Sequence, residues 1–181
     1  LKPVAGYEYR MDDGEWQTSH IFTGLAPNST HQFYQRVAET DTSYASDSSP
    51  ALSVTTDKSQ TAAPEAPTLS EKNDTTVTLK AVAGYEYRMD DGEWQTSNVF
   101  TGLAPNSMHQ FYQRVAETGT SYASDSSLTL SVTTDKSQTA APEAPTLSDK
   151  TDTTVTLKAV AGYEYRMDDG EWQTSNVFTG L

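Results

Sequence analysis

Apolar and polar residues alternate along short segments of the chain, and turn residues separate these segments. Val77 and Leu79 alternate with Thr and Lys over residues 76–80, and two tyrosines and a methionine alternate with Glu and Arg over residues 85–89. A period of two residues is typical of β-strands that bury one face and expose the other. Long helix-forming runs are scarce, so the pattern predicts an all-β chain.

Further strand signals follow along the same stretch. The dipeptide Asp91-Gly92 lies between two β-like runs and predicts a hairpin that returns through Trp94. Three more apolar runs extend the series, at residues 100–103, 109–115 and 128–132. Short strands at even spacing are typical of a β-sandwich, here with about seven strands. Alternation also turns Gln113 inward, where it needs a buried partner or a β-bulge.

The chain repeats itself with a period of 78 residues. When residues 1–78 are aligned with 79–156, only nine of the 78 pairs differ, and residues 157–181 match 79–103 without exception. Solenoid units are generally shorter and cannot bury a core alone, so a period of this length indicates whole small domains in tandem.

Two stretches rich in proline and alanine predict the domain boundaries. They are Ser59–Pro67 and Ser137–Pro145, and each holds two prolines within four residues. Such segments favour extended, semi-rigid connectors, which would place neighbouring domains end to end. The boundaries predict one complete repeat at residues 64–136, the C-terminal part of a repeat at 1–58 and the N-terminal part of a third at 142–181.

Composition and charge narrow the classes of partner. A hydrophobic share of 35% with ten Tyr, five Phe and three Trp suffices for packed cores. With 25 acidic against 12 basic residues, a nucleic-acid backbone or an anionic bilayer would be repelled. The chain has no cysteine and no apolar stretch of the roughly 20 residues that a membrane span needs. Because it starts at Leu1 without a signal-like segment, we expect a mature fragment or an internal segment.

The stretch from Gly102 to Ala116, with Leu-Ala-Pro-Asn-Ser before a strand, resembles the region of fibronectin type III domains where a Leu-x-Pro-Gly-Thr turn precedes a Tyr-bearing strand. The string Tyr-Glu-Tyr-Arg-Met-Asp-Asp-Gly-Glu-Trp, followed by Phe-Thr-Gly-Leu, is similar to fibronectin-like repeats of Gram-positive bacterial surface proteins. The resemblance covers the whole repeat. It implies tandem Ig-like or fibronectin type III-like β-sandwiches, secreted or attached to the cell wall.

One position departs from this family. His31 and His109 stand where the family places a tyrosine whose hydroxyl ties the strand to the preceding corner. An imidazole can donate a hydrogen bond of the same kind, so we predict that both histidines are structural corner residues.

Catalytic and metal sites are not expected. The complete repeat has a single histidine and no cysteine, which offers little for nucleophilic catalysis. Asp90, Asp91 and Glu93 form an acidic cluster, but they lack the alternate-residue spacing of a calcium loop, and turn chemistry accounts for Asp-Gly. We therefore predict no enzyme activity, no metal and no cofactor.

A possible binding face is predicted on the outer side of the sheet. Glu86 and Arg88 should face outward beside Tyr112 and Arg114 of the neighbouring strand. Ordinary cross-strand support would look the same and is the favoured interpretation. Trp94 is expected to fill the core rather than to form a sugar platform.

Three functions fit these observations. The leading hypothesis is a stalk or fibre in which each repeat adds roughly 35–45 Å of length. The second is a multivalent adhesin for a host glycan or matrix protein, in which repetition supplies avidity. The third is a spacer in a large secreted carbohydrate-active enzyme. The partial repeats at both ends add the possibility that chains complement one another end to end in a fibre.

Overall fold

The computed structural model describes residues Leu1–Leu181, and it contains strands but no helix. Twelve strands form four antiparallel sheets of three strands each. The prediction of an all-β sandwich chain is therefore confirmed. The chain divides into two compact units, Leu1–Ser137 and Gln138–Leu181, which are described separately. No helix of the length and hydropathy required to cross a membrane is found.

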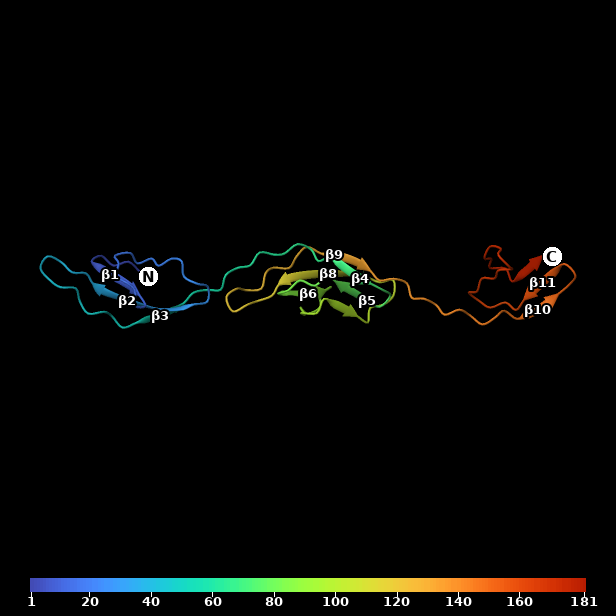
Figure 1. The fold of residues 1–181 in the computed structure, drawn as a ribbon, viewed down its shortest axis with the longest axis horizontal. Helices are drawn as coiled ribbons and strands as arrows, with labels where there is room; N and C mark the ends of the chain where they lie inside the picture. The colour runs from blue at the N-terminus through green and yellow to red at the C-terminus, as the bar shows by residue number, and fades with distance from the viewer. The chain divides into compact units, whose positions relative to one another are not determined.

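The middle repeat, residues 64–136, contains two sheets, drawn from green to orange in Figure 1. One sheet has the strand order β4-β5-β7, and the other has the order β6-β8-β9. The bounds are β4 Leu69–Lys72, β5 Thr76–Leu79, β6 Tyr85–Met89, β7 Val99–Thr101, β8 Met108–Val115 and β9 Leu130–Thr133.

The two sheets share one hydrophobic core. Its buried members are Val77, Leu79, Phe100 and Leu103 from the first sheet and its following turn, and Tyr87, Phe111 and Val132 from the second. Phe100 and Phe111 meet across the sandwich with ring centroids 5.1 Å apart. Each fully buried apolar side chain contributes roughly 1.5–3 kcal/mol, so this cluster is the main source of stability in the repeat.

The structure has six strands in the middle repeat instead of about seven. The hairpin predicted at Asp91-Gly92 is present, but the returning segment forms only the single bridge Tyr87↔Gln95. The strand β4 has no counterpart in the prediction because all four of its side chains are exposed, so it shows no alternation. The final strand begins at Leu130, and Leu128, which the prediction included, is exposed.

Polar contacts join the two sheets of the middle repeat at their margins. Lys72 of β4 donates from Nζ to Asp135 Oδ1 at 2.6 Å and to the carbonyl of Thr133 at 2.8 Å. Gln113 of β8 is buried and donates from Nε2 to the carbonyl of Glu65 at 2.8 Å. The inward amide thus has the partner that the sequence required, supplied by the segment that enters the repeat.

The first repeat, residues 1–58, holds a single sheet with the order β1-β2-β3. Its strands are β1 Tyr7–Met11, β2 Thr30–Val37 and β3 Leu52–Thr55. They correspond to β6, β8 and β9 of the middle repeat. Tyr9 and Phe33 are buried, but Val54 is exposed, whereas Val132 at the same position of the middle repeat is buried.

The third repeat, residues 142–181, holds the other kind of sheet. Its order is β10-β11-β12, with β10 Leu147–Lys150, β11 Thr154–Leu157 and β12 Val177–Thr179. These strands correspond to β4, β5 and β7. Leu157 remains partly exposed, whereas Leu79, its counterpart in the middle repeat, is fully buried.

Candidate functional site

The register of β6 against β8 brings the four predicted face residues together. Glu86 lies opposite Arg114, and Arg88 lies opposite Tyr112. Their neighbours along both strands point into the core, so alternation directs these four side chains to the outer face of the sheet. We call them, together with Trp94, the arginine–aromatic face.

Ion pairing and stacking hold this face together. Arg114 donates to Glu86 Oε2 from Nη2 at 2.7 Å and from Nε at 2.8 Å. The guanidinium of Arg88 lies 4.9 Å from the Trp94 ring centroid and 5.0 Å from that of Tyr112. The guanidinium of Arg114 lies 4.5 Å from the Trp94 ring. Distances below about 6 Å are typical of attractive cation–π contacts.

The expectation that Trp94 fills the core was wrong. Trp94 is absent from the core cluster and is half-buried on the outer face, against Arg88 and Arg114. The bridge Tyr87↔Gln95 explains its position, since it places residue 94 beside residue 88 across the hairpin. The sequence signal that could have placed Trp94 is the Asp91-Gly92 turn. When the residues on the two sides of this turn are paired in antiparallel order, residue 94 lies opposite residue 88.

The same face is built in the first repeat, which shows that the arrangement follows from the repeated sequence. Arg10 lies 5.0 Å from the Trp16 ring and 4.8 Å from the Tyr34 ring. Arg36 lies 4.5 Å from Trp16 and pairs with Glu8 at 2.8 Å. In the third repeat, Arg166 stacks on Trp172, but no counterpart of Arg114 is present and Trp172 is 60% exposed.

The polar groups of the face are mostly paired with one another. The Tyr112 hydroxyl donates to Gln110 Oε1 at 2.7 Å, and Arg114 is neutralised by Glu86. The exception is Arg88 Nε, which is buried and has no hydrogen-bond partner. Guanidinium groups already cover the indole ring, so the face stabilises the pairing of the strands and does not present an open aromatic platform.

The histidine corner is defined by two further contacts. His109 approaches Asp90 Oδ2 with Nδ1 at 2.8 Å, and its Nε2 lies 2.9 Å from Ser107 Oγ. A carboxylate only accepts, so the ring donates from Nδ1. The contact joins the start of β8 to the turn after β6, where Asp90 has a φ of 49°. Asp and Asn are the residues apart from Gly that most readily adopt this left-handed conformation.

Hydrogen bonding controls the ionisation of Asp90. Burial raises the pKa of this carboxyl, but the bonds that it accepts from the Gln110 amide and from His109 together outweigh burial, and the net shift lowers the pKa. Asp12 of the first repeat also has a lowered pKa, caused first by the Gln32 amide and then by His31. The corner therefore favours ionised aspartates.

Ser107, His109 and Asp90 form a chain of hydrogen bonds with the order found in serine hydrolases, which the sequence did not reveal. Their surroundings do not suit that chemistry. The Ser107 hydroxyl donates to the carbonyl of Ala104 at 2.5 Å, and its own amide donates to Thr134 Oγ1 at 2.9 Å. The neighbouring amide of Asn106 donates to Asp135. These two amides are therefore engaged and do not form an oxyanion hole.

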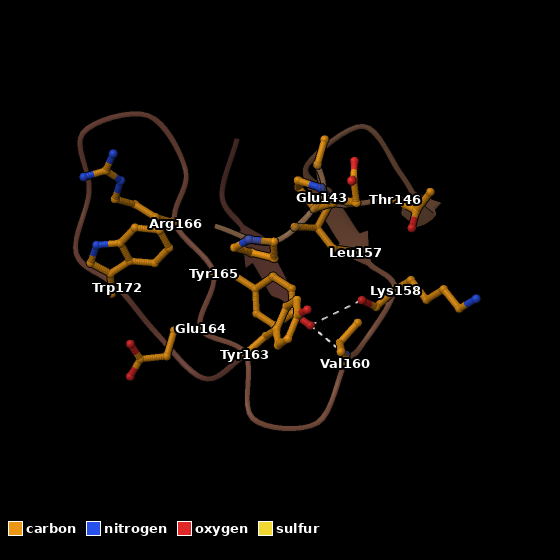
Figure 2. A pocket seen from close by; sticks show the side chains of 13 residues that line it. Glu143, Thr146, Leu157, Lys158, Val160, Tyr163, Glu164, Tyr165, Arg166 and Trp172 are labelled. Atoms are coloured by element: carbon orange, nitrogen blue, oxygen red, sulfur yellow. Dashed lines mark hydrogen bonds between the residues drawn. The ribbon is translucent and has the colours of Figure 1, made fainter. Parts of the chain in front are cut away.

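A pocket with a volume of about 450 Å³ lies in the third repeat (Figure 2). Leu157 and Tyr165 form part of its lining, and the Tyr165 hydroxyl accepts from the Val160 amide at 2.7 Å. In the middle repeat, the tyrosine at the same position, Tyr87, lies opposite Gln113 of β8. The pocket is thus the position that β8 takes in the two-sheet repeat, and it is not an independent ligand cavity.

No three histidine or acidic side chains are grouped where they could hold a metal ion. Asp90 is engaged by the Gln110 amide and by His109, while Asp91 and Glu93 are exposed at the turn. The acidic cluster therefore has the structure of a turn.

Comparisons with known proteins give similar solved structures but no matching family. No protein-family model matches the chain, and no curated protein matches it. Among solved structures, it is similar to the chicken CNTN1 FN1-FN3 domains, with 16% identity over 72% of this chain and 57% of that one, at a TM-score of 0.37. It is also similar to the central fibronectin-III array of RIM-binding protein, with 14% identity over 88% of this chain and 71% of that one, at a TM-score of 0.33. The chain itself is a tandem array of 78-residue repeats whose secondary structure is entirely β.

Proposed function

We propose that this chain is part of an extended, non-catalytic stalk or fibre in which fibronectin-like modules supply length. The main supporting observation is the near-identity of the repeats. A single specialised site needs only one copy of the module, whereas added length needs many copies. The 78-residue period 1–78 has eleven acidic and five basic residues, and the period 79–156 has ten acidic and five basic residues. Like-charged modules repel one another at low salt and keep an array extended and soluble.

We place the stalk outside the cell, secreted or attached to the cell wall of a Gram-positive bacterium. The support for this location is the resemblance of the repeat to fibronectin-like repeats of such surface proteins. Expression of the repeat with its native flanking sequence, followed by surface proteolysis of intact cells, tests the location. Protection of the repeat from protease until lysis would contradict it.

Small-angle X-ray scattering of chains with increasing numbers of repeats tests the stalk. The maximum dimension should rise by roughly 35–45 Å for each added copy of residues 59–136. A dimension that grows only with the cube root of chain length would show collapse and would contradict the proposal.

Multivalent binding of a host glycan or matrix protein is the alternative, and the arginine–aromatic face is the surface that would serve it. Support comes from the presence of this face at corresponding positions of the first and middle repeats. Avidity predicts that a chain of several repeats is retained on a glycan or matrix-protein array far more strongly than residues 59–137 alone. If the array retains neither the chain of several repeats nor the single repeat, multivalent binding is contradicted and the stalk is the remaining proposal.

A spacer role in a larger carbohydrate-active enzyme is a third proposal, and the chemistry would then lie in other domains. The modules themselves should be inactive. Incubation with a p-nitrophenyl ester should give the same hydrolysis rate for the native chain and for H109Q. A burst of product that disappears in S107A would contradict the non-catalytic role.

A further inference from the structure

The linker after the first repeat makes specific contacts with one loop of the middle repeat. Lys58 donates from Nζ to Glu117 Oε1 at 2.5 Å and to the carbonyl of Thr118 at 3.1 Å. The Lys58 ammonium also lies 5.9 Å from the Tyr122 ring centroid. The last charged residue before the linker is therefore bound to the next repeat.

The backbone of the linker pairs with the same loop. The Ser59 amide donates to the carbonyl of Thr120 at 2.9 Å, and the Tyr122 amide donates to the carbonyl of Ser59 at 3.0 Å. The Ser59 hydroxyl adds a bond to Thr120 O at 3.1 Å. This is a short parallel bridge, Ser59↔Ser121, between the linker and the loop of the repeat that the linker enters.

A second part of the first repeat reaches this loop as well. Asn28, in the turn before β2, donates from Nδ2 to the carbonyl of Gly119 at 2.8 Å. Its own amide donates to the carbonyl of Asp57, which ties this turn to the start of the linker. Thr118 and Ser121 close the receiving loop through a backbone bond of 3.0 Å and a side-chain bond of 2.7 Å.

The first repeat offers an internal comparison, because its loop 39–44 differs from 117–122 only by Asp41 in place of Gly119. Tyr44 is 93% exposed in that loop, whereas Tyr122, at the same position of the occupied loop, is 42% exposed. A Cβ atom added at Gly119 would meet no atom within 4 Å, so the backbone of this loop does not itself require glycine.

We propose that the loop Glu117–Tyr122 is a docking site for the linker of the preceding repeat, and that docking fixes the orientation of consecutive repeats. We call the contact of Asn28, Lys58 and Ser59 with this loop the inter-repeat joint. It deepens the proposed stalk and rests on it, since it makes the stalk stiff. The partner is another repeat of the same sequence, because the middle repeat has the same three residue types at the corresponding positions, Asn106, Lys136 and Ser137.

The joint depends on covalent connection. An exposed Lys–Glu pair with a few hydrogen bonds holds two separate molecules weakly. The chain continues from Lys58 directly into the middle repeat, so the effective concentration of the partners is high and weak contacts suffice. Docking within the chain is therefore expected, and association between separate chains through this loop is not.

Electron spin resonance on the full chain tests the joint. The protein has no cysteine, so T18C and T96C introduce spin labels at two corresponding, exposed positions of the first and middle repeats. The labelled chain should give one narrow distance distribution. K58Q and E117Q should each broaden it at least twofold, and the charge exchange K58E with E117K should restore a narrow distribution.

Matched controls come from the repeats themselves. E39Q and K136Q alter the residues that correspond to Glu117 and Lys58 but make no ion pair, so they should leave the width unchanged. A native distribution as broad as that of K58Q, or equal broadening by E39Q, would overturn the joint. A broad distribution around a long mean distance would contradict the joint alone, whereas a short mean distance would contradict the stalk.

Discussion

At the scale of single residues, the outer face of the sheet is organised by arginine. Arg88 stacks between Trp94 and Tyr112, and Arg114 joins the same indole ring to Glu86. These contacts connect two strands and the segment after the hairpin on the solvent side, where no hydrophobic core helps. Planar guanidinium groups stack in this way and an ammonium group does not, so lysine would not replace either arginine.

Trp94→Ala should destabilise the middle repeat by about 2–3 kcal/mol, because it removes a half-buried aromatic ring and two cation–π contacts. Scanning calorimetry of the full chain measures the shift of the unfolding transition. W172A is the matched control, since Trp172 is mostly exposed and stacks on Arg166 alone. An equal loss in both variants would show that the stacked arrangement adds nothing.

Asp90→Asn should change how stability depends on pH. The folded pKa of Asp90 is lowered, so its contribution is complete above the ordinary value of 3.8 and disappears as the pH falls through the lowered value. The native chain should therefore unfold at higher temperature than D90N at pH 7, and the two should converge near pH 2. D91N, at an exposed position of the same turn, should follow the native curve.

At the scale of elements, the sequence predicts strands that bury one face and expose the other. It misses strands that are exposed on both faces. The alternation of 85–89 and 109–115 predicts β6 and β8 because one face of each strand meets the core. β4 is exposed throughout and is fixed only by its pairing with β5 and by Lys72, so it has no such pattern.

The candidate face and the inter-repeat joint also differ in whether sequence alternation predicts them. Four residues of the face could be predicted because they alternate with core residues on paired strands. Trp94 could not be placed with them by its hydrophobicity, which is the property that suggested a core position. The joint connects loops 59 to 91 residues apart in sequence, and no periodicity describes such contacts.

Gln113→Ala should show how β8 is connected to the segment that enters the repeat. Loss of the hydrogen bond from the buried Gln113 amide to the Glu65 carbonyl should cost about 1–2 kcal/mol. Hydrogen exchange of the β8 amides in the full chain measures the loss. Q35A in the first repeat provides the control, because Gln35 is exposed there and its side chain has no such bond. Equal effects of both changes would contradict the role of the Glu65 contact.

At the scale of the whole molecule, mechanical properties depend on how each repeat meets the next. The linker combines the stiffness of its prolines with the contacts of Lys58 and Ser59. Stiffness thus has a backbone component, which is independent of solution conditions, and an ionic component, which is not.

Acid should loosen the inter-repeat joint. The hydrogen bond from Lys58, followed by its charge, lowers the pKa of Glu117. The ion pair is therefore intact above the ordinary value of 4.5 and is lost as the pH falls through the lowered value. The spin-label distance distribution should broaden between pH 5 and pH 3. E117Q should show no such change, and a native width independent of pH would contradict the ionic component.

The register of β8 against β6 has a consequence for folding kinetics. β8 differs only at Met108 and Thr30 from β2 of the first repeat, which pairs with β1 in the same register. A refolding chain therefore holds two nearly identical strands that can enter the same site, and exchange between repeats competes with correct pairing. Near-identity lets one module be copied many times, and it also makes strand-swapped, slowly rearranging species the characteristic misfolded products of this chain.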